Sequence, residues 1–270
     1  MGSAEGQENA VLHKLQGNDL VRAREYKKAL REYDHAIKLD PLYSDAFNNR
    51  GAAFQHMGRY EQALDDHRMA VKLDPWDAVA HYNLGNDLQS LGQYGEALVS
   101  YDTAVEINPR FAEAYTNRGV AYFNLGEHEK AIENYNRSVH INPALADAYN
   151  NRGNAYHQLG DYELALEDYT IAIRLDPGDA ATFSNRGIAN LRLKQFQDAL
   201  DDYDTAIGLD ASLGEAYAGR CLAYLLLGDD DRAQRDMNSA VHLGVQRPDL
   251  FEAVDKIRSS PDLRSPAGAG

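Results

Sequence analysis

Apolar residues in this sequence follow a helical spacing that recurs along the chain. In the stretch ending at Pro177 they occur at i, i+1, i+4, i+7 and i+8, the spacing of one helix face: Ala165, Leu166, Tyr169, Ala172 and Ile173. A matching stripe that includes Tyr149 and Gly153 precedes them, and the LGDY sequence at 159–162 supplies a Gly for a turn. The pattern predicts two helices joined as a hairpin.

The pattern returns every 34 residues. Five prolines mark the period without an insertion: Pro41, Pro75, Pro109, Pro143 and Pro177. Proline lacks an amide donor and disfavours a helical conformation in the residue before it, so each one ends a second helix. Extending the frame both ways predicts seven hairpins, at residues 10–43, 44–77, 78–111, 112–145, 146–179, 180–213 and 214–247. Positions 1–34 denote places within a hairpin.

Two positions hold small residues in every hairpin. Position 8 is Gly in six hairpins and Cys in the last: Gly17, Gly51, Gly85, Gly119, Gly153, Gly187 and Cys221. Position 20 is Ala throughout: Ala29, Ala63, Ala97, Ala131, Ala165, Ala199 and Ala233. A larger side chain in a packed interface costs about 1–3 kcal/mol. Both positions therefore predict close contact between helices.

The ends of the chain depart from the repeat. Residues 1–9 and 259–270 offer little to bury and are predicted to be disordered. Residues 248–258 carry an apolar helical face, which predicts a helix that caps the last hairpin: Leu250, Phe251, Val254 and Ile257.

The sixth hairpin is the least regular. Asn190 replaces an apolar residue, Lys194 the turn Gly, and Ala211 the terminal Pro. We expect the array to be loosest there.

The recurrence of small, aromatic, Ala and Pro positions over residues 10–247 resembles the tetratricopeptide repeat family, most clearly at residues 146–179. The resemblance implies an all-α fold, a right-handed superhelix of seven 34-residue helical hairpins followed by the capping helix. It also implies that the first helix of each hairpin lines a concave groove, where such proteins commonly hold an extended peptide or a partner helix. Fold alone does not determine function.

Asparagine dominates the groove that the resemblance implies. Position 6 holds it in five consecutive hairpins: Asn49, Asn83, Asn117, Asn151 and Asn185. Position 9 adds Asn18, Asn86 and Asn154. Each side chain offers an acceptor and two donors, so such a row suits the backbone of an extended peptide. It is similar to the row in the repeat domain of O-linked N-acetylglucosamine transferase. Alternatively, these amides bond to neighbouring hairpins and preserve the curvature.

A second resemblance concerns the carboxylate clamp by which co-chaperones hold the C-terminal tail of a chaperone. Lys14, Asn18 and Asn49 occupy three matching places. The third hairpin would need cations at positions 2 and 6, where this chain has Val79 and Asn83. The clamp is at best half formed.

The remaining groove wall is polar and partly acidic. Position 2 carries four acids: Asp45, Glu113, Asp147 and Glu215. Further along, the wall is lined by Gln55, His56, Gln89, Asn124, His157 and Gln158. The last hairpin has Leu222, Leu225 and Leu226 in the equivalent places, which predicts either an apolar pocket or contact with the capping helix.

Arginine recurs at position 7: Arg50, Arg118, Arg152, Arg186 and Arg220. The third hairpin has Leu84 there, with Val99 and Ser100 at positions 22 and 23. Hairpins with the Arg have carboxylates on the second helix: Asp65, Asp66, Glu133, Glu167, Asp168, Asp201, Asp202 and Asp236. This correlation predicts a repeated ion pair inside the array.

Charge and cysteine content exclude several functional classes. A net charge of -15 argues against nucleic-acid backbones and anionic membranes as ligands. The single Cys221 excludes an intramolecular disulfide, and the start of the chain carries no signal or anchor, so a cytoplasmic location is expected. No apolar run approaches membrane-spanning length.

The motifs of catalysis and metal binding are also missing. The nine His residues show no zinc-ligand spacing, and there is no nucleotide loop or nucleophile elbow. We therefore expect a non-catalytic scaffold without a cofactor, which binds a protein or peptide partner and is a monomer or weak homo-oligomer. A basic partner is one interpretation of the acidic groove. The alternatives are a self-assembling solenoid and a co-chaperone-like adaptor.

Overall fold

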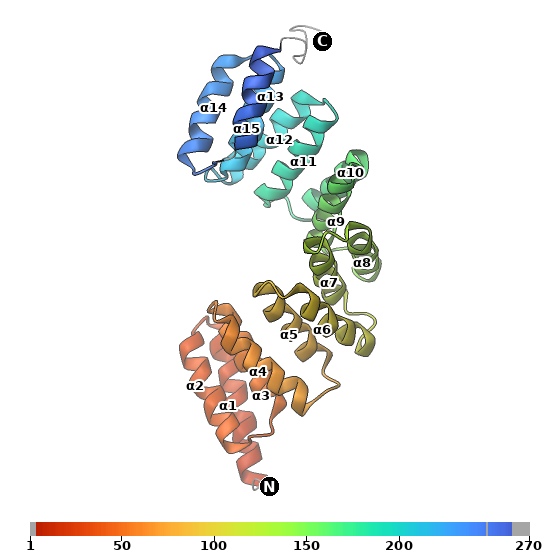
Figure 1. Ribbon diagram of the computed structural model, residues 1–270. Coiled ribbons are helices and arrows are strands. Elements are labelled where there is room, and N and C mark those ends of the chain that lie inside the picture. Colours follow the sequence, from red (N-terminus) through yellow and green to blue (C-terminus); the bar gives the residue numbers. More distant parts are fainter. Residues whose placement is uncertain (1–3, 247, 261–270) are drawn as a thin grey trace. The chain divides into compact units, whose positions relative to one another are not determined.

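The computed structural model describes residues 4–246 and 248–260. Within those residues the chain forms fifteen α-helices and no strands. The helices are α1 (Ala4–Arg22), α2 (Tyr26–Leu39), α3 (Ser44–His56), α4 (Tyr60–Leu73), α5 (Ala78–Ser90), α6 (Tyr94–Ile107), α7 (Ala112–Asn124), α8 (His128–Ile141), α9 (Ala146–Leu159), α10 (Tyr162–Leu175), α11 (Ala180–Arg192), α12 (Phe196–Leu209), α13 (Gly214–Leu226), α14 (Asp230–His242) and α15 (Pro248–Ser259). This is the all-α array of hairpins expected from the sequence (Figure 1).

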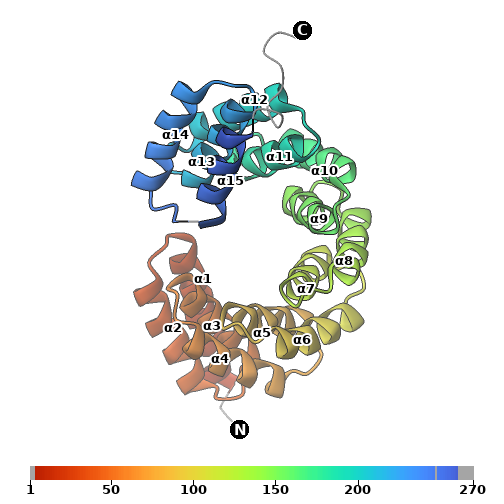
Figure 2. The ribbon, with the colours of Figure 1, turned by 45° about the horizontal axis from the view of Figure 1, so that its top comes forward.

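The first fourteen helices pair in chain order as hairpins 1 to 7, from α1–α2 to α13–α14. They belong to two compact units, an N-terminal unit ending at Ile141 and a C-terminal unit beginning at Asn142. In the N-terminal unit the first helices α1, α3, α5 and α7 contact one another in sequence, and the second helices α2, α4 and α6 pack on α3, α5 and α7 (Figure 2). In the C-terminal unit α9, α11, α13 and α15 follow the same order.

Close contact between the two helices of a hairpin depends on the Gly at position 8. A Cβ added to Gly17 would lie 2.4 Å from the ring of Tyr33 at position 24, and one at Gly119 would lie 2.6 Å from Tyr135. Hairpin 7 has Cys221 in place of Gly and the flexible Met237 in place of the ring. The Ala residues at position 20 are fully buried, as expected: Ala29, Ala63, Ala97, Ala131, Ala165, Ala199 and Ala233.

The turn inside each hairpin places position 15 in the left-handed region. Five of these residues are glycines with φ between 69° and 87°: Gly58, Gly92, Gly126, Gly160 and Gly228. The other two are Arg24 and Lys194, with φ of 59° and 61°. Lys194 thus adopts the glycine conformation at a cost of roughly 1–2 kcal/mol, and hairpin 6 keeps its turn.

Asn190, the polar substitution in hairpin 6, is buried and donates to Oδ2 of Asp202 at 2.9 Å. The side chain is therefore satisfied inside the hairpin. The expectation that the array is loosest there stays a prediction.

At the C-terminus, α15 extends the predicted capping helix by one residue. Val254 and Ile257 are buried in a cluster with Leu225, against which Leu222 and Leu226 also pack. The apolar face of hairpin 7 is thus a contact with the cap. The side chains of Leu250 and Phe251 lie outside the described residues, as do residues 261–270 of the predicted disordered tail.

The predicted boundary at the N-terminus was wrong, because α1 begins at Ala4 and not at residue 10. The AEGQEN segment contains good helix formers and no Pro, so the helix of hairpin 1 continues into it. Residues 1–3 of the expected disordered lead lie outside the described residues.

Replacing Lys194 by Gly should stabilise the protein by about 0.5–1 kcal/mol, because relief of backbone strain exceeds the entropic cost of a glycine. The reverse change at a matched site, Gly160→Ala, should destabilise it by about 1 kcal/mol, since a Cβ there meets no other atom within 4 Å and only φ is unfavourable. Urea unfolding followed by circular dichroism measures both changes. Equal midpoints for wild type and Lys194→Gly would contradict the assignment of strain.

Candidate functional site

The position 6 asparagines donate from one hairpin to the one before it. Nδ2 of Asn49 donates to Oδ1 of Asn18 at 2.9 Å, and Nδ2 of Asn117 donates to Oδ1 of Asn86 at 2.8 Å. Asn83 and Asn185 donate instead to an Asn at position 5 of the preceding hairpin, to Asn48 at 2.9 Å in the N-terminal unit and to Asn150 at 3.2 Å in the C-terminal unit. Asn151 is half-buried on α9. The row is therefore structural in part, as the alternative interpretation held.

Asparagines at position 9 accept two of these four bonds. Oδ1 of Asn18 accepts from Asn49 and also from the hydroxyl of Tyr33 at 2.8 Å. Asn86 and Asn154 accept in the same way from Tyr101 and Tyr169, each at 2.8 Å. Since a carbonyl oxygen has two lone pairs, Oδ1 of Asn18 is fully used. Position 9 can offer a ligand its amide donors, while the carbonyls of Asn18 and Asn86 hold neighbouring hairpins together and that of Asn154 holds the tyrosine of its own hairpin.

Capacity for a ligand remains at position 6. Asn49, Asn83 and Asn117 are half-buried, and none of their Oδ1 atoms accepts a hydrogen bond from the residues that the structure describes. Their donors point to the preceding hairpin, so each amide is held in one orientation. A half-exposed, oriented acceptor is the group that a peptide N–H requires.

The row ends at hairpin 7, where position 6 is Gly219. A Cβ there would lie 2.5 Å from the hydroxyl oxygen of Tyr203, so the ring occupies the space of the amide. Position 9 of hairpin 6 is Ile188, and within the described residues the buried Tyr203 hydroxyl has no hydrogen-bond partner. Burial raises the pKa of this phenol.

The three residues of the half-formed clamp lie close together but are engaged with other groups. Nζ of Lys14 lies 3.4 Å from Oδ2 of Asp45 and over the ring of Tyr43. Burial lowers the pKa of Lys14, but Tyr43 and Asp45 raise it by more, so the pKa lies above its ordinary value. Asn18 holds Asn49 as described. A carboxylate ligand would have to compete with Asp45 for the cation.

Two of the predicted wall residues, Gln55 and Asn124, make hydrogen bonds within the array. Nε2 of Gln55 donates to Oδ1 of Asp87 at 2.6 Å and to the main-chain carbonyl oxygen of Asn83 at 3.2 Å, so its donors are used. Nδ2 of Asn124 donates to the carbonyl of Val120 on its own helix. Burial, with Arg192 nearby, lowers the pKa of His157, which favours its neutral form.

A buried pair between hairpins 2 and 3 was missed by the sequence analysis. His67 replaces the usual position 24 tyrosine, and its Nδ1 lies 2.5 Å from Oδ2 of Asp87, both side chains being fully buried. Its Nε2 faces the carbonyl oxygen of Asn48 at 3.2 Å. The signal was present in the sequence, because His67 is the one His at a position otherwise held by Tyr or Met.

The predicted ion pair at position 7 is confirmed. Two nitrogens of Arg50 donate to the two carboxylate oxygens of Asp66 at 2.8 and 2.6 Å, and Arg220 makes the same paired contact with Asp236. Arg152 and Arg186 contact Asp168 and Asp202 likewise. Each guanidinium also lies over the position 4 ring of its own hairpin: Phe47, Tyr115, Tyr149, Phe183 and Tyr217.

The partner expected for Arg118, Glu133, was wrong. Nε of Arg118 donates to Oδ1 of Asn134 at 2.6 Å, because position 23 and not position 22 faces the first helix. Its charge is met by Asp102 of the preceding hairpin at 2.7 Å. Arg50 and Arg220 also reach back, to Asp34 and Asp204, so the arginines join hairpins as well as helices.

We call the contact between the position 7 arginine and the position 23 side chain of the same hairpin the arginine brace. It offsets the cost of burying the position 23 carboxylate. Desolvation raises the pKa of Asp202 above its ordinary value, although hydrogen bonds from Arg186 and Asn190 oppose the shift. The carboxylate would therefore be poorly tolerated without its partners.

Comparisons with known proteins agree with this architecture. A family model described as "TPR repeat" matches residues 17–58, 85–126 and 121–160, and one described as "Tetratricopeptide repeat" matches residues 44–77 and 146–179. Together the matches cover more than half of the chain. The chain belongs to the tetratricopeptide repeat family. The recognition made from the sequence is thus confirmed.

Solved structures of this family share the fold. A tetratricopeptide repeat protein from Parabacteroides merdae is 18% identical, with a TM-score of 0.69 over 93% of this chain and 99% of that one. MamA is 26% identical, with a TM-score of 0.56 over 64% of this chain and 95% of its own. YrrB, described as a TPR protein with an unusual peptide-binding site, is 23% identical, with a TM-score of 0.55 over 68% of this chain and 95% of its own.

Tetratricopeptide repeats indicate a protein–protein interaction scaffold, and proteins of this family are generally non-catalytic. In residues 4–246 and 248–260, each helix is too short or too polar to span a bilayer.

Replacing Arg50 by Leu should destabilise the protein by about 2–4 kcal/mol, because Asp66 is left buried without its partner. The double change Arg50→Leu with Asp66→Ser recreates the pair that hairpin 3 already has in Leu84 and Ser100, and it should recover most of the loss. Urea denaturation gives both values.

The exposed Asp34 provides the control for this prediction. Asp34→Ala removes only the outer partner of Arg50 and should cost less than about 1 kcal/mol. A double variant no more stable than Arg50→Leu would show that the buried carboxylate is not the source of the cost.

Proposed function

We propose that this chain binds an extended segment of a protein partner along the first helices of its hairpins, with the position 6 asparagines contacting the peptide backbone. In the N-terminal unit the contacts would be made by Asn49, Asn83 and Asn117, and in the C-terminal unit by Asn151 and Asn185. Amide donors of Asn18, Asn86 and Asn154 would supplement them. The observation that carries the proposal is that Asn49, Asn83 and Asn117 are half-buried, with their donors held by the preceding hairpin and no described residue donating to their Oδ1 atoms.

The proposal follows from how the amides are held. A free Asn side chain loses rotamer freedom when it binds, whereas these amides are already fixed by a bond to the preceding hairpin, so less entropy is lost. Because an amide contacts the backbone of a peptide, the row would select for an extended shape more than for a sequence.

Charge supports a basic partner. The exposed acids Glu113 and Asp147 lie at position 2, at the start of α7 and α9, and the chain as a whole carries a net charge of -15. Exposed charges of this kind accelerate the encounter with a basic segment and disfavour an acidic one. The likeness to YrrB supports only the fold, but that protein is described as having a peptide-binding site.

The carboxylate-clamp alternative is less well supported, since Lys14 already contacts Asp45. Self-assembly of the solenoid stays a prediction. The capping helix α15 covers hairpin 7, which leaves that end of the array less suited to stacking on another copy.

Comparing Asn83→Ala with Asn48→Ala separates the proposed peptide-binding role of the position 6 asparagines from their structural role. Both variants remove the bond between Asn83 and Asn48, so both should lose about 0.5–1.5 kcal/mol of stability. Only Asn83→Ala removes the ligand-facing carbonyl, since Asn48 is 8% exposed. Affinity for the best binder from an array of short basic peptides should fall about tenfold in Asn83→Ala, a change of about 1.4 kcal/mol, and by clearly less in Asn48→Ala, which keeps the carbonyl and removes only the bond that orients it.

Fluorescence anisotropy with the resynthesised peptide measures these affinities, and Asn238→Ala on the second helix of hairpin 7 serves as a remote control. Equal affinities for Asn83→Ala and Asn48→Ala would defeat the proposal that the row contacts the peptide.

The basic character of the partner has its own test. Glu113→Gln should weaken binding of the same peptide by about 1.5- to 5-fold at low salt. The difference in affinity from wild type should shrink as salt screens the charge. A difference that does not change between low and high salt would contradict an electrostatic role.

A further inference from the structure

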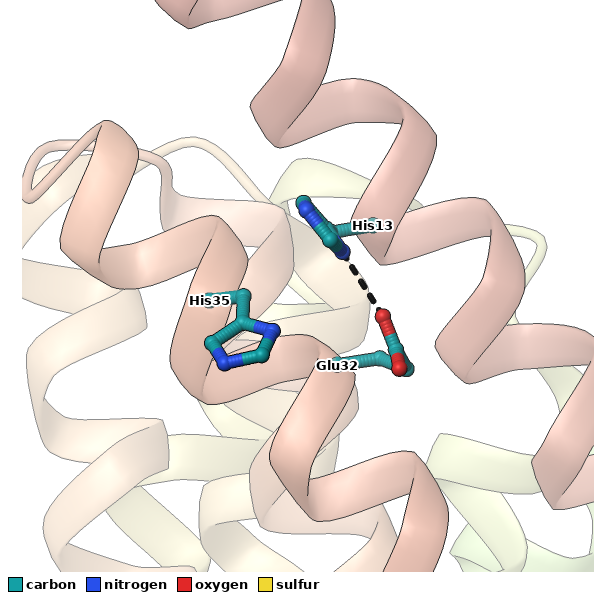
Figure 3. A group of neighbouring side chains, drawn as sticks. All are labelled: His13, Glu32 and His35. Atoms are coloured by element: carbon teal, nitrogen blue, oxygen red, sulfur yellow. Dashed lines mark hydrogen bonds and ion pairs between the residues drawn. The ribbon is translucent and has the colours of Figure 1, made fainter.

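Three side chains capable of ligating a metal come together in hairpin 1. They are His13 on α1 and Glu32 and His35 on α2, and their potential ligand atoms all lie within 4.8 Å of one another (Figure 3). Nδ1 of His13 and Oε2 of Glu32 are 2.7 Å apart, and the rings of His13 and His35 are 5.1 Å apart at an angle of 70°. Sequence spacing did not reveal this group, because its members come from two helices.

The group occurs where the arginine brace is missing. Hairpins 1 and 3 have Gln16 and Leu84 at position 7, and both have His at position 4, where the other hairpins have an aromatic ring. Hairpin 3 also lacks a carboxylate at position 23, which is Ser100. Hairpin 1 keeps the carboxylate as Glu32, so it has an acid at position 23 without an arginine at position 7 to pair with it.

We propose that His13, Glu32 and His35 form a binding site for a divalent transition-metal ion such as Zn²⁺, which braces hairpin 1 as arginine braces hairpins 2 and 4 to 7. Two imidazole nitrogens and one carboxylate oxygen are a common ligand set for zinc, with water completing the tetrahedron. Mg²⁺ and Ca²⁺ prefer oxygen ligands only, so the site discriminates against them.

The geometry is close to that required. Bonds of about 2.0–2.2 Å to a tetrahedral zinc place ligand atoms about 3.3–3.5 Å apart. Since the potential ligand atoms here lie up to 4.8 Å apart, they must move by about 1 Å to bind zinc. Rotation of the side chains supplies this movement without moving either helix. Glu32 and His35 are three residues apart on α2 and share a face.

Access and exposure also suit a metal. The side chains of His13 and Glu32 are 31% and 26% exposed, and His35 is exposed, so an ion can enter from solvent and a water can occupy the fourth place. The two helices belong to one hairpin, which gives the ligands a rigid support. The site is independent of the proposed peptide binding.

Isothermal titration of the full chain, prepared without a histidine tag and stripped with chelator, tests the proposal with ZnCl₂ as the probe. Wild type should bind one zinc ion that His35→Ala and Glu32→Gln bind about tenfold more weakly or worse, since even the groups that orient metal ligands contribute 10- to 100-fold. His81→Ala is the matched control, because His81 occupies the same place in hairpin 3 but has no acid beside it and faces the carbonyl of Pro75. That variant should bind as wild type does.

Nuclear magnetic resonance provides a second measurement. The imidazole signals of His13 and His35 should shift together on addition of zinc and stay unchanged with Mg²⁺. Zinc binding by His35→Ala that equals wild type would overturn the proposal, because the ion would then lie elsewhere among the nine His residues. Absence of zinc binding by wild type would show that the group is an ordinary hydrogen-bonded cluster.

Discussion

The contact between the position 8 glycine and the position 24 ring is the constraint on which the other features of this protein depend. Without a Cβ at Gly17, Gly85 or Gly153, the tyrosine lies directly against the first helix and its hydroxyl passes that helix to reach the amide at position 9. In hairpins 1 and 3 that amide in turn holds the asparagine of the next hairpin. One missing methyl group thus links packing inside a hairpin to hydrogen bonding between hairpins and to the surface offered to a ligand.

The fold could be predicted almost completely because its determinants are local and repeated. A period marked by Gly17, Ala29 and Pro41 fixes helix, turn and hairpin without knowledge of distant contacts. The arginine brace was also predictable, since Leu84 and Ser100 vary together in hairpin 3. The start of α1 was not, because the segment before residue 10 has helix-forming residues but no apolar stripe by which the pattern could recognise it.

The site was less predictable than the fold. The periodic pattern identifies the asparagines at position 6 but not the direction in which each amide points. That direction depends on a partner 31 to 35 residues away. The pairs His67 with Asp87 and His13 with Glu32 likewise join different helices. Long-range pairs of this kind leave no mark in a periodic pattern except as departures from it, such as His67 in a column of tyrosines.

Position 9 gives the array a second, longer period. In hairpins 1 to 6, Asn18, Asn86 and Asn154 alternate with Ala52, Val120 and Ile188, so a tyrosine hydroxyl bonds to an amide at position 9 in hairpins 1, 3 and 5. In chemical terms the module of hairpins 1 to 6 is 68 residues, twice their geometric repeat. Insertion or loss of a single hairpin within this stretch would place two like members side by side, whereas insertion or loss of a pair would keep the alternation. Hairpin 7 ends the alternation, since Leu222 follows Ile188, and there Met237 replaces the ring and needs no amide partner.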